Sequence, residues 1–354
     1  MTAPFGVYVH IPFCSNRCDY CAFATWDDRS HLIDDYVGAL VEETRRAELP
    51  PADTVFFGGG TPSLLRPEQL ATVLSAVAPG PGAEVTVECN PETVTPDLLS
   101  GYRAAGVNRI SLGVQSLSAS VLHALGRRHR RDVVAPVAEM VSDAGFTNFN
   151  LDLIFGAAGE TLEDWSETLR GAVDLGPTHI SAYALTVEPG TPLAAAPDRH
   201  PDADLQADMY SVTDELLRAA GYQWYEISNW SRPGRECRHN LLYWRQGDYR
   251  GLGCAAHSHR SGRRWWNVRT PERYMRAVAT GECVEAGSES LSLDARVSEA
   301  LTLSLRTREG VPADAFDDVS ELCAAGLVDV ADGRASLTVR GRLLANEVAA
   351  RLRG

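Results

Sequence analysis

Three cysteines near the N-terminus have a spacing that suits an iron–sulfur cluster. Cys14, Cys18 and Cys21 follow the pattern C-x-x-x-C-x-x-C. Three thiolates on one loop can bind three irons of a four-iron cluster and leave the fourth iron open to another ligand. The alternatives are a zinc site, for which no fourth ligand lies at finger spacing, and a disulfide, which would leave one cysteine unpaired.

A run of three glycines, Gly58–Gly60, precedes Thr61. Without Cβ atoms, such a run lets backbone amide and carbonyl groups approach a bound molecule closely. An ordinary turn between a strand and a helix is the alternative. A phosphate-binding P-loop is excluded because that loop needs a lysine, and all 33 basic residues of this chain are arginine.

Strand-like and helix-like patterns alternate along the first 220 residues. The strands and helices that they predict must position the cysteine loop and the glycine run. Strands are predicted over 7–11, 55–57, 84–88, 109–114, 148–155 and 179–185, and helices over 32–48, 67–78, 96–104, 132–144, 162–173 and 203–220. Six strand–helix units predict an α/β fold with a parallel sheet. A closed barrel needs eight units, so we expect an open, three-quarter barrel.

Polar signals fall where these strands end. The cysteine loop follows the first strand and the glycine run follows the second, while Glu88 ends the third, Gln115 ends the fourth and Asp152 lies in the fifth. Ligands of parallel βα folds bind at the carboxyl ends of the strands, so we expect one site there. Glu88 could accept hydrogen bonds from ribose hydroxyls. Taken alone, each of these residues would more often have a structural role than a functional one.

Composition narrows the classes of function. A formal net charge of −14 argues against nucleic-acid binding. No apolar run approaches the roughly 18 residues of a membrane span. The N-terminus lacks the features of a secretory signal. Eight cysteines without scaffold spacing suit a reducing compartment, so we expect a cytoplasmic protein.

The last third of the chain changes character. Residues 221–270 hold five of the seven tryptophans, three of the nine histidines and nine arginines against three acidic residues. Helices are predicted over 294–306, 319–325 and 340–352, with a hairpin of strands 327–330 and 335–339. We therefore expect a partial barrel over 1–220, an aromatic and basic segment over 221–275 that caps it, and a winged-helix-like α+β module over 276–354.

The cysteine and glycine runs together resemble the radical S-adenosylmethionine (SAM) superfamily. In that family the open iron binds the amino and carboxylate groups of SAM, and one electron from the cluster cleaves the sulfonium to a 5′-deoxyadenosyl radical. The resemblance implies a 4Fe-4S cluster on Cys14, Cys18 and Cys21. It implies SAM contacts at Tyr8, Tyr20, Gly59, Gly60, Thr61, Glu88, Gln115, Arg127 and Asp152.

Further motifs are similar to the coproporphyrinogen-oxidase-like branch, HemN and its relatives, and in particular to the HemW heme chaperones. They include Ser-Leu-Gly-Val-Gln-Ser, Leu-Gly-Arg-Arg-His and Gly-Leu-Gly-Cys-Ala-Ala-His-Ser. The oxidase has a fourth cysteine where this chain has Phe23. It also has a long arm where only thirteen residues precede Cys14.

Two functions follow from this resemblance. The first is a heme chaperone that binds heme and passes it to client proteins, with an electron donor serving the cluster. For heme, the aromatic and basic segment offers Trp and Arg side chains, and His239, His257 and Cys237 as candidate axial ligands; each of these could instead belong to the core. The second is a radical SAM enzyme acting on a porphyrin or aromatic substrate, either an oxidase or a methyltransferase.

Overall fold

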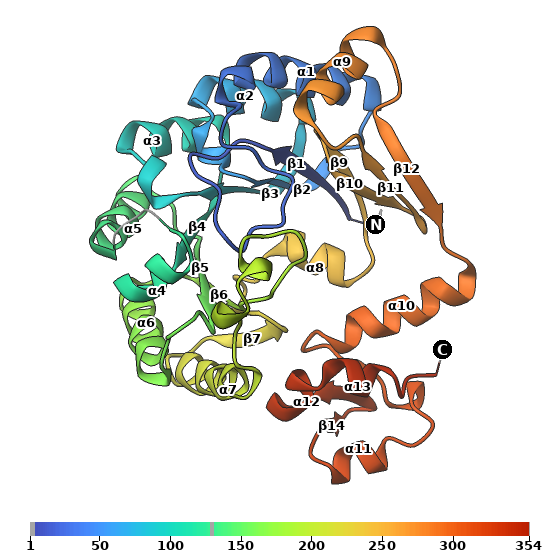
Figure 1. The fold of residues 1–354 in the computed structure, drawn as a ribbon. Helices are drawn as coiled ribbons and strands as arrows, with labels where there is room; N and C mark the ends of the chain where they lie inside the picture. Colours follow the sequence, from blue (N-terminus) through green and yellow to red (C-terminus); the bar gives the residue numbers. More distant parts are fainter. Residues whose placement is uncertain (1–3, 128–130, 354) are drawn as a thin grey trace.

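A computed structural model describes residues 4–127 and 131–353 of the chain (Figure 1). Six parallel strands lie side by side in chain order, as the sequence predicted. They are β1 (Phe5–Ile11), β2 (Ala52–Gly59), β3 (Pro79–Cys89), β4 (Arg109–Gln115), β5 (Phe149–Phe155) and β6 (His179–Ala184). The register sets Val7 opposite Val55 and Val9 opposite Phe57.

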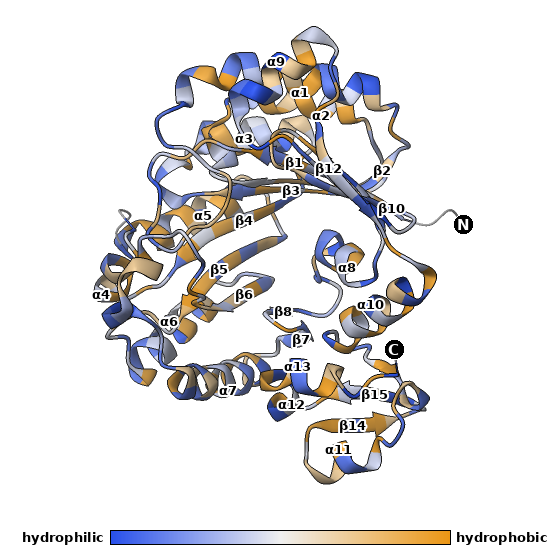
Figure 2. Cartoon of the chain, turned by 45° about the vertical axis from the view of Figure 1, so that its right-hand side comes forward, coloured by the Kyte–Doolittle hydropathy of each residue, from blue (hydrophilic) through white to orange (hydrophobic). Residues whose placement is uncertain are grey.

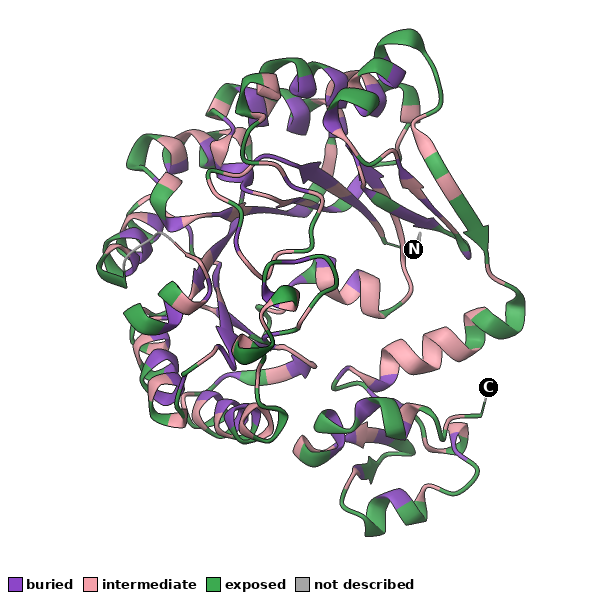
Figure 3. Cartoon of the chain, viewed as in Figure 1, coloured by how far each residue is buried: buried purple, intermediate pink, exposed green. Residues whose placement is uncertain are grey.

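The predicted helices follow these strands and cover the outer face of the curved sheet (Figure 1). They are α1 (Ile33–Ala47), α2 (Pro67–Val77), α3 (Pro96–Ala105), α5 (Val134–Asp143), α6 (Leu162–Asp174) and α7 (Ala203–Ala219), with a short α4 (Ala119–Ala124) after β4. Polar caps set several starts: the Thr161 side chain accepts from the backbone N–H of Asp164 at α6. The main apolar core, purple in Figure 3, lies between this helical layer and the sheet.

Residues 221–275, expected to cap the barrel, add strands to both edges of the same sheet. On the β6 side β8 (Asn229–Ser231) pairs antiparallel with β6, and β7 (Gln223–Glu226) pairs antiparallel with β8. On the β1 side β9 (Asp248–Leu252) is parallel to β1, and β10 (His257–Arg260) and β11 (Arg263–Asn267) follow. The edge strand β12 (Glu285–Ser290) comes from the chain after residue 275. Within the described part of the chain the sheet has twelve strands, and its two edge strands, β12 and β7, do not pair with each other.

Helix α8 (Arg238–Trp244) joins the two edges and lies on the concave side of the sheet (Figure 2). Its His239 ring bonds to Thr54 near the start of β2, and its first backbone amides donate to the Glu84 carboxylate. The helix therefore closes the barrel lumen at the amino ends of the strands. None of the described helices is long and apolar enough to cross a membrane.

The C-terminal part forms a module with its own apolar cluster. After α9 (Pro271–Thr280) come α10 (Leu293–Leu305), β13 (Val311–Pro312), α11 (Ser320–Ala324), β14 (Val328–Ala331), β15 (Arg334–Leu337), α12 (Val339–Leu343) and α13 (Ala345–Ala349). The predicted hairpin is present, with Asp332 and Gly333 at positive φ. The prediction of one helix over 340–352 was wrong, because Leu344 leaves helical geometry and divides it.

A buried ion pair joins the C-terminal module to the barrel. Arg342 of α12 lies 2.9 Å from the Asp214 carboxylate of α7, and both side chains are largely buried. The Arg342 guanidinium also lies 4.4 Å from the centre of the Trp224 ring. The division into three domains stays a prediction, since β7, β8 and β9 belong to the same sheet as the first 220 residues.

A single buried carboxylate ties the late edge strands to the first helix. Glu43 of α1 accepts hydrogen bonds from Arg250, from the backbone N–H of Gly253, and from Asn267 and Tyr274, at 2.7 to 3.1 Å. Its side chain is 4% exposed. These four donors lie in or beside β9, β11 and α9, so Glu43 fixes that edge of the sheet against α1.

We predict that Glu43→Ala lowers the free energy of unfolding by about 3–5 kcal/mol, because the buried Gly253 N–H, Asn267 and Tyr274 lose their acceptor and the partly exposed Arg250 loses its ion-pair partner. Chemical unfolding followed by circular dichroism measures this loss. The matched control is Glu42→Ala, whose exposed pairs with Arg45 and Arg46 are expected to contribute less than about 1 kcal/mol. Equal losses in the two variants would contradict the anchoring role of Glu43.

Candidate functional site

The cysteine loop leaves β1 at its carboxyl end and is closed by backbone hydrogen bonds. The N–H of Cys14 donates to the Trp26 carbonyl at 2.9 Å, and that of Cys21 donates to the Cys18 carbonyl at 3.2 Å. All three thiols are unpaired and border one cavity of about 640 Å³. The loop therefore presents three possible metal ligands to one space.

The same cavity collects side chains from five strand ends. It is bordered by Tyr20, Gly59, Gly60, Thr61, Glu88, Gln115, Arg127 and Asp152, all of them predicted as site residues, and also by Asn90, Phe23 and Tyr183, which were not. The parallel sheet thus brings together groups that lie far apart in sequence, such as Cys14 and Asp152, which are 138 positions apart. Asn90 follows β3 directly, so its place at a strand end was the signal that could have identified it.

The glycine run packs against the cysteine loop so tightly that a side chain does not fit. The N–H groups of Gly60 and Thr61 donate to the carbonyls of Ile11 and Phe13. A Cβ at Gly60 would lie 2.5 Å from the Phe13 carbonyl oxygen and 3.0 Å from the Cys14 sulfur. Gly59 has φ +111°, a region that favours glycine.

The Glu88 carboxyl lies on the floor of the cavity. It accepts a hydrogen bond from the Gly59 N–H at 3.1 Å. Burial, and secondly the negative charge of Asp152, raises the pKa of Glu88 to about 8, although the Gly59 N–H and Arg109 act in the opposite direction. A cation bound beside Glu88 would favour the ionised carboxylate.

Arg127 reaches the cavity from the loop after α4. Its guanidinium donates to Asn90 Oδ1 at 2.5 Å, to the Gly113 carbonyl at 2.9 Å and to the Cys18 sulfur at 3.3 Å. Burial works to lower the pKa of Arg127, but the nearby Tyr20 and Cys18 raise it above its usual value. Arg127 therefore holds a fixed positive charge beside the cysteine loop.

Two polar residues, Gln115 and Asp152, complete the lining of the large cavity. Gln115 ends β4 with φ +64°, at a register shift between β4 and β5. Asp152 of β5 accepts hydrogen bonds from Ser111 at 2.7 Å and Asn150 at 2.9 Å, and burial raises its pKa. The last two residues of the predicted Leu-Gly-Arg-Arg-His motif, 128 and 129, lie outside the described residues.

Tyr8 and His239 border a second, smaller cavity deeper in the lumen. The Tyr8 hydroxyl bonds to His10 Nδ1 at 3.0 Å. Both ring nitrogens of His239 are occupied, one by the Thr54 hydroxyl at 2.8 Å and the other by the Tyr243 hydroxyl at 2.7 Å, and burial lowers the pKa of the ring to about 3. His239 would have to give up one of these bonds to bind iron.

The candidate heme ligands do not form one cluster. Cys237 is buried and its thiol donates to Glu84 at 3.6 Å. His257 on β10 is exposed and stacks on Trp266 with 5.8 Å between ring centres. No hydrogen bond among the described residues involves the His257 ring, so His257 differs from His239 in having its nitrogens available.

Comparison with known proteins identifies the family. Residues 8–172 match the family model described as the radical SAM superfamily. The heme chaperone HemW of Mycobacterium tuberculosis (strain H37Rv) is 43% identical, over 99% of this chain and 95% of that protein. HemW of Escherichia coli (strain K12) is 42% identical, over 72% of this chain and 70% of that protein, and HemW of Bacillus subtilis (strain 168) is 32% identical, over 97% of both. This chain belongs to the HemW family.

The fold of this HemW family member is also similar to a solved structure. Coproporphyrinogen III oxidase (HemN) from Escherichia coli, described as a radical SAM enzyme, superposes with a TM-score of 0.84 at 25% identity, over 98% of this chain and 89% of that chain. The predicted α/β partial barrel with a C-terminal module is therefore confirmed.

The residues of this HemW-family chain fit a 4Fe-4S cluster better than a single metal ion. No group of three His, Cys, Asp or Glu side chains in 4–127 and 131–353 converges as ligands of one ion would. The thiolates of a cluster bind different irons and need not converge on one point. The loop offers three thiols without disulfides that border one cavity, and the absence of a side chain at Gly60 leaves room beside the Cys14 sulfur.

We predict a pH-dependent stability from Glu88 in the iron-free protein. Because the folded-state pKa of about 8 exceeds the ordinary value of 4.5, the folded state holds a proton that the unfolded chain releases. The free energy of unfolding should therefore fall as pH rises from about 5 to 8. Glu88→Gln should make this fall shallower, while Glu160 and Glu226, whose pKa values burial also raises, keep contributing to it. Urea unfolding across that range measures the slope.

The control is Glu68→Gln, because Glu68 is an exposed carboxylate in the first turn of α2. Glu68→Gln should leave the pH dependence of the free energy of unfolding the same as in the parent protein. If Glu88→Gln also left it unchanged, Glu88 would not hold a proton in the folded state.

Proposed function

We propose that this protein is a heme chaperone that binds heme and transfers it to client proteins. The supporting observation is the 43% identity to a protein named heme chaperone HemW over 99% of the chain, against 25% to the oxidase HemN. Phe23, 66% exposed, stands where the oxidase has a further cysteine, so the loop has no fourth thiol at that place. In this proposal the protein works in the cytoplasm, where its thiols stay reduced.

The cluster and SAM belong to the large cavity in this proposal. Cys14, Cys18 and Cys21 hold the cluster, whose chemistry when SAM is bound is one-electron cleavage of the sulfonium. Arg127 pairs with the SAM carboxylate, Glu88 accepts from the ribose hydroxyls, and Tyr20 contacts the adenine. Gly59, Gly60, Thr61, Gln115 and Asp152 complete the contacts in the large cavity, and Tyr8 would contact SAM from the smaller cavity that adjoins it. An electron donor protein would reduce the cluster.

Heme binds at the aromatic and basic segment, residues 221–275. Of the two candidate histidines, His257 is favoured as axial ligand because it is exposed and its ring nitrogens are free of hydrogen bonds to described residues. Partial burial of the ring lowers the pKa of His257, which favours the neutral imidazole that a metal ligand requires. His239 remains the second candidate for this role.

We predict that replacing any one of Cys14, Cys18 and Cys21 by Ala removes the cluster, which reconstituted protein should hold at about four irons per chain. Iron content and visible absorption after anaerobic reconstitution measure this. Cys89→Ala is the matched control, because Cys89 borders the same cavity but lies outside the loop. Loss of iron in the Cys89 variant alone would refute the assignment of the loop.

The proposed function is tested by hemin titration and transfer to apomyoglobin. Hemin should bind stoichiometrically, and His257→Ala should shift the Soret band while His31→Ala, on the surface before α1, should not. The triple cysteine variant should keep hemin binding, because residues 221–275 are separate from the cysteine loop in sequence. If a His239 variant shifted the Soret band and the His257 variant did not, His239 would be the axial ligand of heme in place of His257.

A second function is favoured by the TM-score of 0.84 to coproporphyrinogen III oxidase. It is a radical SAM reaction on a porphyrin or aromatic substrate, either an oxidase or a methyltransferase reaction. Protein that takes up no hemin but decarboxylates coproporphyrinogen in the presence of SAM and a reductant would replace the chaperone proposal with this one.

A further inference from the structure

The segment between β6 and α7, residues 186–200, reaches the cysteine loop; we call this segment the strap. It contains two short 3₁₀ helices, Leu193–Ala195 and Pro197–Arg199. Thr186 and Glu188, near its start, border the large cavity together with the three cysteines. The strap is therefore a wall of the cofactor cavity to which none of the predicted site residues belongs.

Side chains within the strap hold its shape. The Thr191 hydroxyl donates to the Glu188 carbonyl at 2.7 Å and accepts the Ala194 N–H at 3.2 Å. The His200 ring bonds to the Leu193 carbonyl at 3.1 Å. Because these bonds link its start, middle and end, the strap can act on the cysteine loop as one body.

One residue of the cysteine loop, Asp19, receives two contacts from the strap. Its backbone carbonyl accepts the Leu193 N–H at 3.0 Å. Its carboxylate pairs with the Arg199 guanidinium at 2.9 Å, and the same guanidinium nitrogen donates to the Ala124 carbonyl at the end of α4 at 2.7 Å. On another side Asp19 lies against Gly126, where a Cβ would come within 3.1 Å of its carboxyl group. Asp19 is therefore held between the strap and the end of α4.

These contacts act on the turn that carries two of the three cysteines. Asp19 follows Cys18 directly and precedes Tyr20 and Cys21. Residues 12–29 belong to no helix or strand of the described chain, so the turn depends on contacts from neighbouring segments. Leu193 of the strap, 3% exposed, also packs in one apolar cluster with the Tyr20 side chain. The strap thus contacts two consecutive residues between the cysteines.

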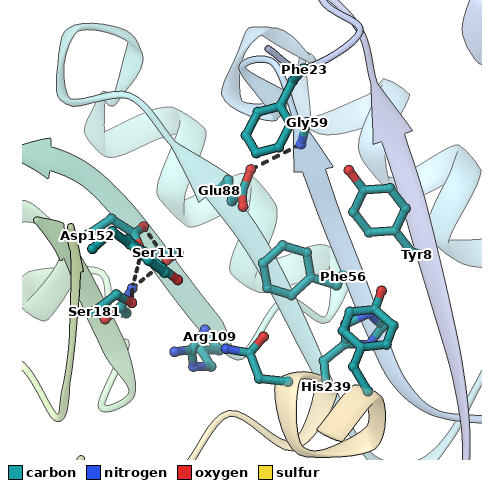
Figure 4. A pocket seen from close by; sticks show the side chains of 14 residues that line it. Tyr8, Phe23, Phe56, Gly59, Glu88, Arg109, Ser111, Asp152, Ser181 and His239 are labelled. Carbon is teal, nitrogen blue, oxygen red and sulfur yellow. Dashed lines mark hydrogen bonds between the residues drawn. The ribbon is translucent and has the colours of Figure 1, made fainter. Parts of the chain in front are cut away.

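The two ends of the loop are held by other contacts. The Cys14 N–H donates to the Trp26 carbonyl at 2.9 Å. Phe23 and Gly59 both line the smaller cavity (Figure 4). Neither of these contacts involves the strap. A change in the strap should therefore loosen the turn of residues 18–21 and leave the Cys14 end of the loop in place.

We propose that Arg199 is a positioning residue for the cluster-binding turn, because its pairing with Asp19 and the end of α4 holds the strap against residues 18–21. Two of the three cluster ligands would then be in place before iron binds, which lowers the entropic cost of ordering them. This inference rests on the proposed function, in which the cysteines hold the cluster. The Arg199 and Asp19 side chains are 30% and 36% exposed, so solvent screens their pair only in part.

The experiment measures hydrogen exchange in the iron-free protein. The Cys21 N–H donates to the Cys18 carbonyl and the Leu193 N–H to the Asp19 carbonyl, so the exchange of these two amides reports the turn and the strap. In Arg199→Met both amides should exchange about two- to fivefold faster than in the parent protein, the range expected for a partly exposed ion pair. The Cys14 N–H should exchange at the parent rate.

The second measurement is the rate at which a chelator, bathophenanthroline disulfonate, removes iron from the reconstituted protein. Arg199→Met should release iron about two- to fivefold faster, and Arg199→Lys, which keeps the charge, should regain part of the parent behaviour. Asp19→Ala should act like Arg199→Met. The double variant should show no further increase, because both changes remove the same contact.

The matched control is Arg170→Met, whose exposed pair with Glu163 lies on α6. It should leave both rates unchanged. Circular dichroism shows whether each variant is folded, and if Arg199→Met does not fold, Asp19→Ala and Arg199→Lys decide the result. Exchange at Cys21 and Leu193 that is the same in Arg199→Met as in the parent protein, or equally fast in Arg170→Met, overturns the proposal.

Two further outcomes keep this inference separate from the proposed function. If exchange is faster in Arg199→Met but iron is released at the parent rate, Arg199 orders the turn without positioning the cluster ligands, and the proposal is overturned. If the parent protein takes up no iron, the assignment of the cluster fails, while faster exchange in Arg199→Met still supports the hold of the strap on the turn.

Discussion

Parallel pairing of β1 to β6 is the constraint on which the rest of the molecule depends. Because the six strands run in one direction, the loop or turn after each of them opens at the same end of the sheet. The cysteine loop, the glycine run, Glu88, Gln115 and Asp152 share a cavity for this reason alone. A shift of one residue in the register of any two paired strands would turn a side chain that lines the cavity toward the helical layer instead.

The polar interior shows how charge is distributed along that lumen. Arg127 lies beside the cysteine loop, Glu88 and Asp152 lie midway, and Arg109 lies deepest. Arg127 is held by Asn90 and Gly113, whereas the guanidinium of Arg109 is not bonded by any described residue. Two arginines therefore lie on either side of the two carboxyl groups along the lumen. The cavity of the proposed cofactor site thus adjoins a deeper cavity that is lined by a different set of side chains.

The later part of the chain completes the barrel in two ways. Strand β9 returns to pair in parallel with β1, and Glu43 fixes that edge through four hydrogen bonds. Helix α8 closes the amino end of the lumen by capping itself on Glu84. The C-terminal module is attached through Arg342 and Asp214. Segments distant from the cysteine loop in sequence thus shape the space that the loop opens into.

The sequence by itself determined the six strand–helix units, the cysteine spacing and the polar strand ends, because each depends on residues close together in the chain. Arg109 was missed as a lumen residue, since a polar residue at the start of a strand has no local signal of what faces it. Tertiary structure alone decided that residues 221–275 add strands to both edges, that the His239 nitrogens are already bonded, and that Leu344 divides the last helix. These outcomes depend on pairings between segments far apart in sequence, whose energies no local pattern contains.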